Sequence, residues 1–245
     1  MTTAVAPLPL ATRHRVLIAL GALLSATLVI WGTLTLVDLM AHQHQDVHLS
    51  FTVPASQVRI RLNSGSVRIV PATGSTVEVD RHLSWGLTHP NVNEHVVAGV
   101  LEIDAGCSGV INTICTTRYD LAVPTTFAVQ AHSSAGDVRV TGLDGPLDLS
   151  SSAGDVVADS LASTEVRAQS SAGSVDVAFK IEPHHVEARS SAGPVTVVVP
   201  PGGAAYRVDA HTSAGSTKVN VRTDPQSDRV IVADSSAGDV TVRSG

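Results

Sequence analysis

Aromatic and charged residues are both scarce in this chain of 245 residues. Three Phe, two Trp and two Tyr make up 3% of it, 16% of the residues are charged, and the net charge is −6. Single-stranded nucleic acids need aromatic side chains to stack on and positive charge to attract them, so this composition argues against nucleic-acid binding. It also argues against a pocket lined by aromatic rings. The hydrophobic fraction of 43% still indicates a folded chain.

Charged residues are absent from one long apolar segment near the N-terminus, residues 16–37. At about 1.5 Å per residue, a helix of this length crosses a hydrocarbon core of roughly 30 Å. Arg13 and Arg15 precede the segment, and the positive-inside rule then places residues 1–15 in the cytoplasm. We therefore expect a single-pass membrane anchor with the remainder outside. A cleaved signal peptide is the alternative, and it also places residues 41–245 outside the cytoplasm.

The C-terminal half repeats a phrase centred on Ser-Ala-Gly, as in QSSAGSVDV and DSSAGDVTV. Its glycines are 18 to 23 residues apart, by subtraction of their numbers. A weaker copy, RLNSGSVRI, stands earlier in the chain. Repeats of this length cannot bury an apolar face alone and are typical of stacked architectures. The structural repeat glycines are Gly65, Gly136, Gly154, Gly173, Gly193, Gly215 and Gly238.

Apolar residues alternate with polar ones on both sides of each repeat glycine. Around Gly173 the apolar positions are Val166 and Ala168 before it, and Val175 and Val177 after it. Period-two alternation is typical of a strand with one buried face. Each copy therefore predicts a strand, a Ser-Ala-Gly corner and a second strand.

We expect an all-β ectodomain, a β-solenoid or β-roll of about seven such coils, following the N-terminal transmembrane helix. Stacked coils bring Val over Val and Ala over Ala, and this narrow interior accounts for the missing aromatic residues. A β-sandwich of repeated hairpins is the alternative, since it also uses short strands at regular spacing. The last strand, ending near Val242, is expected to be an exposed edge.

The hydroxyls of the repeat form two ladders, at three and two positions before each glycine. No His or Asp recurs at a matching position, so we interpret the ladders as structural, bonding to turn backbone or to each other. Gly-Asp pairs at 136–137, 154–155 and 238–239 are similar to calcium-binding β-rolls. The nine-residue pattern with a second glycine is missing, so no metal or cofactor is predicted.

Residues 71–126 interrupt the repeat with three further strand-like runs, 76–83, 95–104 and 117–123. The only two cysteines, Cys107 and Cys115, lie between the second and third runs. Outside the cytoplasm such a pair favours a disulfide. Zinc or redox chemistry would need CxxC-type spacing or nearby His residues.

The order of these features resembles the bacterial putative-adhesin family over residues 51–245. The resemblance rests on the disulfide loop, the strand TTRYDLAVP and the repeated SAGDVxV phrases. It implies an extracytoplasmic β-repeat domain of unknown function, often carried by membrane-anchored envelope proteins, some of which accompany envelope-stress signalling. The resemblance transfers no functional residue.

Two sets of histidines raise the question of metal binding. His42, His44 and His48, with Asp46, could bind Zn²⁺ or Cu²⁺ weakly, although we interpret residues 38–50 as a polar juxtamembrane linker. His132 and His211 occupy the same repeat position four coils apart. At about 4.8 Å per strand they are too distant to share a metal.

Outward positions vary from coil to coil, as in Arg139, Val157, Asp176 and Thr196. Glycan-cleaving enzymes need an acid/base pair, and no column of carboxylates provides one. The sequence therefore predicts a protein that is not an enzyme: a membrane-anchored envelope or surface interaction module, adhesin-like or linked to stress sensing. Its expected partner is an envelope protein or a glycan. A polysaccharide-active β-helix enzyme and a passive spacer are the alternatives.

Overall fold

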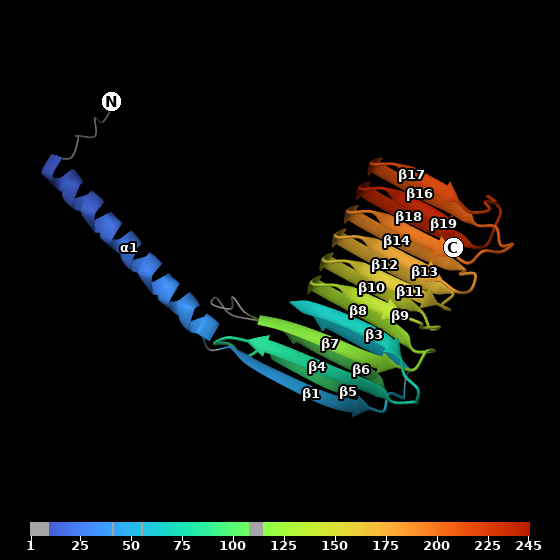
Figure 1. Cartoon of the computed structure of the whole chain (residues 1–245), viewed down its shortest axis with the longest axis horizontal. Coiled ribbons are helices and arrows are strands. Elements are labelled where there is room, and N and C mark those ends of the chain that lie inside the picture. Colours follow the sequence, from blue (N-terminus) through green and yellow to red (C-terminus); the bar gives the residue numbers. More distant parts are fainter. Residues whose placement is uncertain (1–9, 41, 55, 108–114) are drawn as a thin grey trace, which may run out of the picture.

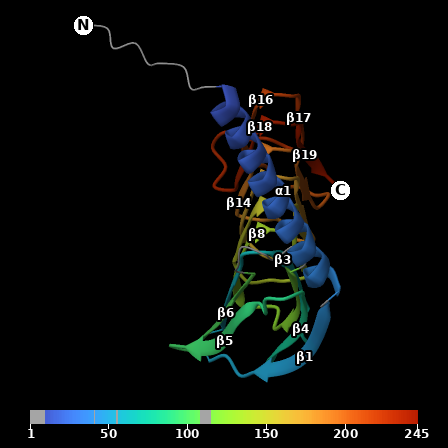
Figure 2. The ribbon, with the colours of Figure 1, turned by 90° about the vertical axis from the view of Figure 1, so that its left-hand side faces the viewer.

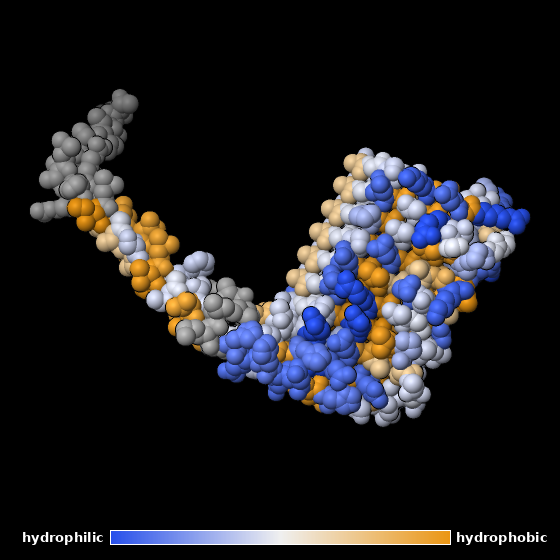
Figure 3. All heavy atoms as spheres, in the orientation of Figure 1, coloured by the Kyte–Doolittle hydropathy of each residue, from blue (hydrophilic) through white to orange (hydrophobic). Residues whose placement is uncertain are grey.

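The computed structural model describes residues 10–40, 42–54, 56–107 and 115–245. Residues 1–9 of the expected tail, and residues 108–114 between the cysteines, lie outside the described residues. Helix α1 (Leu10–Met40) is separate from the β domain in Figure 1. Its segment Ile18–Val37 is long and apolar enough to cross a membrane, and none of this segment is buried. The hydrophobic residues along α1 are visible in Figure 3.

The hydroxyl groups inside α1 are bonded within the helix itself. Ser25 donates to the Gly21 carbonyl at 2.9 Å, and Thr27 donates to the Leu24 carbonyl at 2.8 Å. Thr33 and Thr35 donate in the same way to Ile30 and Gly32. Polar groups satisfied in this manner carry little cost in hydrocarbon, where no water is available.

The β domain consists of two sheets. Sheet A has ten strands, in the order β1 (Gln43–Phe51), β4 (Val77–Trp85), β7 (Cys115–Val123), β3 (Gly65–Pro71), β9 (Val138–Thr141), β11 (Val156–Leu161), β13 (Val175–Phe179), β15 (Val195–Val199), β19 (Val240–Ser244) and β17 (Thr217–Asn220). Sheet B has nine, in the order β16 (Arg207–Ala214), β18 (Val230–Ala237), β14 (His185–Ala192), β12 (Glu165–Ala172), β10 (Leu147–Ala153), β8 (Ala128–Ala135), β2 (Gln57–Leu62), β6 (Val100–Gly106) and β5 (Asn91–Val97).

Each repeat forms one rung, meaning a strand of sheet B, a Ser-Ala-Gly corner and the next strand in sheet A. Equivalent positions stack in parallel register, so Val166 of β12 pairs with Leu147 of β10 and Val186 of β14. Their side chains are fully or almost fully buried between the sheets. This stacking confirms the solenoid-like prediction, because repeated hairpins would pair each strand with its own sequence neighbour instead.

The repeat glycines lie where neighbouring rungs approach most closely. Gly173 has a φ of 156°, and a Cβ built on it would overlap the Gly154 carbonyl of the rung below. A side chain would therefore separate the two rungs and weaken the backbone hydrogen bonds between them.

The order of the rungs in space differs from their order in the sequence. The C-terminal rung, β18–β19, lies between β14–β15 and β16–β17. The prediction that the last strand is an exposed edge is therefore wrong, and the outer edges are β16 and β17. Ile231 and Val240 of the inserted rung replace Val208 and Thr217 of the outer one, so the more apolar copy occupies the more buried place.

The middle segment differs from expectation in two further respects. The predicted run 95–104 is a hairpin of β5 and β6, with Ala98 and Gly99 both at positive φ in the turn. Such a two-residue turn matches the twist of antiparallel strands. The expected linker 38–50 contributes β1, which pairs with β4 along its whole length. Figure 2 shows the two sheets face to face, further apart at the end with β1 and β5.

Candidate interaction surface

The outer face of sheet B carries a groove of about 630 Å³ that crosses the strands from β8 to β16. Outward residues of each strand line it, since the alternate residues form the core, and next to the corner the serines at both ladder positions line it. Six of its lining side chains occupy two outward repeat positions and differ from rung to rung: His132, Arg167, Gln169, Arg189, His211 and Asp234. The backbone of this face is therefore regular, whereas its side chains differ in chemical character from rung to rung.

The charged side chains of this groove are paired with one another and with Glu187, which lies beside the groove. Arg189 Nη1 lies 2.8 Å from Glu187 Oε1, and its Nε lies 3.2 Å from Asp234 Oδ2. Arg167 Nη2 approaches the same Glu187 oxygen at 3.4 Å. This sharing makes the groove polar but nearly neutral, which suits a ligand that forms hydrogen bonds more than a highly charged polymer.

The two serine ladders have different roles. In the first, Ser190 Oγ donates to the Gly173 carbonyl at 2.8 Å, and Ser170 Oγ donates to the Gly154 carbonyl at 2.9 Å. The same bond recurs at Ser133, Ser151, Thr212 and Ser235. The second ladder is exposed and lines the groove through Ser152, Ser171, Ser191, Ser213 and Ser236. One hydroxyl ladder thus holds the rungs together, and the next faces solvent.

One serine does contact a histidine, which sequence reasoning did not anticipate. His132 Nδ1 lies 2.9 Å from Ser150 Oγ across adjacent strands. No carboxylate is seen to orient this imidazole among the residues that the structure describes. The pair therefore lacks the third member of a nucleophilic triad. His132 and His211 are five strand steps apart in sheet B, one more than predicted, because β18 intervenes.

The aspartates of the Gly-Asp pairs accept hydrogen bonds from the backbone of a neighbouring rung. Asp137 and Asp155 accept the N–H groups of Asp155 and Ser174 at 3.0 and 2.8 Å. Asp239 accepts the N–H of Ser216 at 2.8 Å, and this hydrogen bond lowers the pKa of its carboxyl. These carboxylates link successive rungs at the corner.

A family model, Toastrack DUF4097, matches residues 46–243. The chain belongs to the Toastrack DUF4097 family. Among solved structures, a putative cell adhesion protein from Clostridium sporogenes aligns with a TM-score of 0.52 at 14% identity, covering 83% of this chain and 100% of its own. A putative adhesin from Bacteroides fragilis aligns with a TM-score of 0.41 at 15% identity, covering 82% and 97%. No curated protein matches. The family match confirms the predicted resemblance, and the Clostridium structure supports the fold.

The Toastrack domain joins its two sheets covalently at the end where they diverge. Cys107 follows β6 of sheet B, Cys115 begins β7 of sheet A, and the predicted disulfide connects them with a Cα–Cα distance of 5.9 Å. Cys115 packs against Leu83 and Trp85 in a small apolar cluster. The disulfide therefore limits how far the two sheets can separate.

A buried polar cluster near that disulfide was not predicted. Arg81 Nη1 donates to Glu94 Oε2 at 3.0 Å, and the Tyr119 hydroxyl donates to Glu94 Oε1 at 2.9 Å. Arg81 and Tyr119 belong to sheet A and Glu94 to sheet B. Burial, and then the Glu94 charge, raise the pKa of Tyr119. In β4, Arg81 shares the inward-facing alternate positions with Val79 and Leu83. This placement was the signal in the sequence from which its burial could have been predicted.

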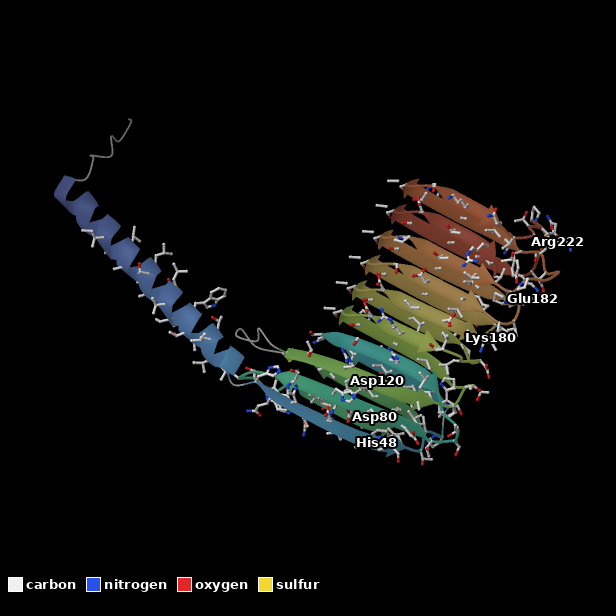
Figure 4. All side chains as sticks on the ribbon, in the orientation of Figure 1. His48, Asp80, Asp120, Lys180, Glu182 and Arg222 are labelled. Atoms are coloured by element: carbon white, nitrogen blue, oxygen red, sulfur yellow. A yellow bond between two sulfur atoms is a disulfide. The ribbon has the colours of Figure 1, made fainter. Side chains whose placement is uncertain are left out.

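The histidines that follow α1 lie on or beside β1 of the Toastrack domain. His48 Nδ1 lies 2.6 Å from Asp80 of β4, and His82 Nδ1 lies 2.7 Å from Asp46. Figure 4 shows His48, Asp80 and Asp120 on three neighbouring strands of sheet A. No cluster of three or more His, Cys, Asp or Glu suited to a metal occurs in the described part of the chain.

Proposed function

We propose that this Toastrack protein is a non-enzymatic interaction module of the bacterial envelope. In this proposal α1 anchors it in the membrane, and the outer face of sheet B binds an envelope protein or a glycan. The observation that carries the proposal is the groove of about 630 Å³, built on a rigid ladder of backbone hydrogen bonds and lined by side chains that change from rung to rung. Rigid elements with variable outward residues are well suited to recognition.

The location outside the cytoplasm is supported by two features. The Cys107–Cys115 disulfide is stable in oxidising compartments and rare in reducing ones. The span Ile18–Val37 follows Arg13 and Arg15, which the positive-inside rule keeps on the cytoplasmic side. A short cytoplasmic tail followed by an external domain is consistent with both the disulfide and the position of the two arginines.

The ion pairs in the groove favour binding over catalysis. A glycosidase needs one carboxylic acid that holds a proton beside a second, ionised carboxylate. Glu187 and Asp234 both contact Arg189, at 2.8 and 3.2 Å. Both carboxylates are therefore engaged by the same guanidinium, and they do not form the carboxyl pair that such an enzyme uses.

Affinity capture with the full-length protein in detergent tests the proposal. Ser191→Trp would fill the groove at an exposed position, and Thr141→Trp, exposed on the outer face of sheet A away from the groove, is the control. Extracted envelope proteins and purified peptidoglycan sacculi are the two probes. We expect S191W to lose at least about tenfold in a capture that T141W retains, because overfilling excludes a bound chain.

Equal capture by both variants would remove the groove from the proposal. Capture of neither probe by the unmodified protein would favour a passive spacer. Release of soluble fragments from the sacculi would favour the enzyme alternative.

A further inference from the structure

The stack is open at the end formed by β16 and β17. Val208 and Ala210 of this rung are half-buried, and Val219 is 38% exposed. One rung inward, Ile231, Ala233 and Val242 are each 0% exposed. Because repeat proteins need their terminal rungs covered, this half-covered core is available to a further strand.

Among the residues that the structure describes, none pairs with part of the outer edge of β16. The Arg207 N–H donates to the Arg229 carbonyl beside β18, and alternate residues of a strand direct their backbone groups to the same side. Val208, Ala210 and Thr212 therefore direct theirs to the open side. Tyr206 is already covered, since its N–H donates to Arg222 and its carbonyl accepts from Asp224.

At the opposite end of the stack, the edge strand of sheet B is protected against strand addition. There Glu94, on the edge strand β5, points inward and pairs with Arg81. An inward-pointing charge on an edge strand discourages pairing with another chain. The inward residues of β16 are Val208, Ala210 and Thr212, and none of them is charged.

We propose that two copies of this chain associate through β16, antiparallel about Ala210. A two-fold axis that maps one edge onto itself makes the paired strands antiparallel. When the pairing is centred on Ala210, the Ala210 residues of the two copies exchange backbone hydrogen bonds. Val208 then lies opposite Thr212 of the second copy. Asp209 then lies opposite His211 of the second copy, so groups of complementary character meet on the outer face.

Other registers are less favourable. A register centred on Asp209 places the two carboxylates opposite each other, and one centred on His211 pairs the two imidazoles. A register centred on Val208 brings Ala210 of the second copy against Tyr206, whose edge is occupied by residues 222–224. The Ala210 register uses only the unpaired part of the β16 edge. It places Asp209 opposite His211, so that two identical polar side chains do not face each other.

This pairing would join the molecules at the end remote from α1, since β1 and β17 are the two edges of sheet A. The two membrane helices would then stand at opposite ends of the assembly. Copies anchored in facing membranes could thus meet tip to tip, a consequence that rests on the proposed function, whereas the pairing itself does not.

The first test is cross-linking of the full chain in detergent. Among the described residues no cysteine is free, so Ala210→Cys introduces one reactive thiol. We expect rapid oxidation of A210C to a covalent dimer, because paired Cα atoms about 5.5 Å apart lie within disulfide range. Ala214→Cys, exposed on the same strand but far from its own counterpart in this register, is the control. Dimerisation of A214C as fast as A210C would overturn the register.

The second test is a charge exchange followed by sedimentation velocity. His211→Asp is expected to raise the dimer dissociation constant about tenfold or more, because two carboxylates then face each other across the interface. Combining it with Asp209→Lys places a lysine opposite the new carboxylate, and this double variant is expected to restore the dissociation constant. Both positions are exposed, and circular dichroism checks that each variant folds. A monomer at every concentration tested, or open-ended polymers, would overturn the proposal.

Discussion

Ser190 Oγ donates a 2.8 Å hydrogen bond to the carbonyl of Gly173, one rung away in the stack. Ser190 is 5% exposed, so the bond is shielded from water. Loss of the hydroxyl would remove this donor from the carbonyl of the half-buried Gly173. Ser190→Ala is expected to cost about 0.5–1.5 kcal/mol of unfolding free energy. Thermal or denaturant unfolding measures this effect.

Ser191→Ala is the matched control, since Ser191 is the next residue and is exposed. Its expected change lies within about 0.5 kcal/mol. Equal destabilisation by the two substitutions would contradict the division of the serines into a structural and an exposed ladder.

Gly173→Ala is expected to destabilise the stack by about 1–3 kcal/mol, as overpacking in a close contact does. The added methyl would overlap the Gly154 carbonyl. Gly203→Ala provides the comparison, because a methyl group added there would meet nothing within 4 Å. Unfolding temperatures that fall equally for both variants would mean that close approach is not the reason for glycine at this corner.

Glu94→Gln is expected to cost about 3–5 kcal/mol, because it leaves the Arg81 charge buried without its partner. The side chains of Arg81 and Glu94 are only 13% and 7% exposed. The double variant Arg81→Met, Glu94→Met is expected to recover much of this loss, since it removes both charges together. Denaturant unfolding of the three variants checks both expectations, and a double variant no better than E94Q would argue against the ion pair as the cause.

The contact between His48 and Asp80 is expected to make the docking of β1 dependent on pH. The hydrogen bond that His48 donates to Asp80, followed by the Asp80 charge, raises the pKa of His48 above 6.5. A raised folded-state pKa adds stability that is fully present below about pH 6.5 and is lost as the pH rises through the raised value. Amide hydrogen exchange of β1, corrected for the intrinsic rate, should therefore accelerate above that value.

His48→Gln should reduce this pH dependence and leave the exchange of β12 unchanged. A direct NMR titration of His48 shows whether its pKa is raised or lowered. A His48 pKa at or below 6.5 would contradict the assignment.

The membrane topology is tested with single cysteines and a maleimide that cannot cross membranes. In intact cells, Ser134→Cys should be labelled and Thr3→Cys should be labelled only after lysis, because α1 is expected to separate them. Labelling of neither position before lysis would place the domain inside the cell. Loss of residue 3 from the mature protein would indicate a cleaved signal peptide.

Much of the fold followed from local pattern. The alternation around Gly173 predicts two strands and a corner, since period-two burial and a glycine at a close approach are properties of the chain itself. The presence of just two cysteines, Cys107 and Cys115, in a domain expected outside the cytoplasm likewise favoured the disulfide. The contacts of Arg81, Glu94 and Tyr119 could not be predicted in this way, because they join residues from two sheets whose pairing depends on the whole stack.

The sequence by itself determined the rung, because Val, Ala, Ser and Gly at fixed positions specify which face is buried and where the chain turns. It did not determine the order of the last two rungs. Both copies present nearly the same inward pattern, so either can stack on β14–β15. Only the tertiary structure decided, by placing Ile231 and Val240 inside and leaving Val208 and Thr217 at the open end, where less apolar surface remains exposed to water.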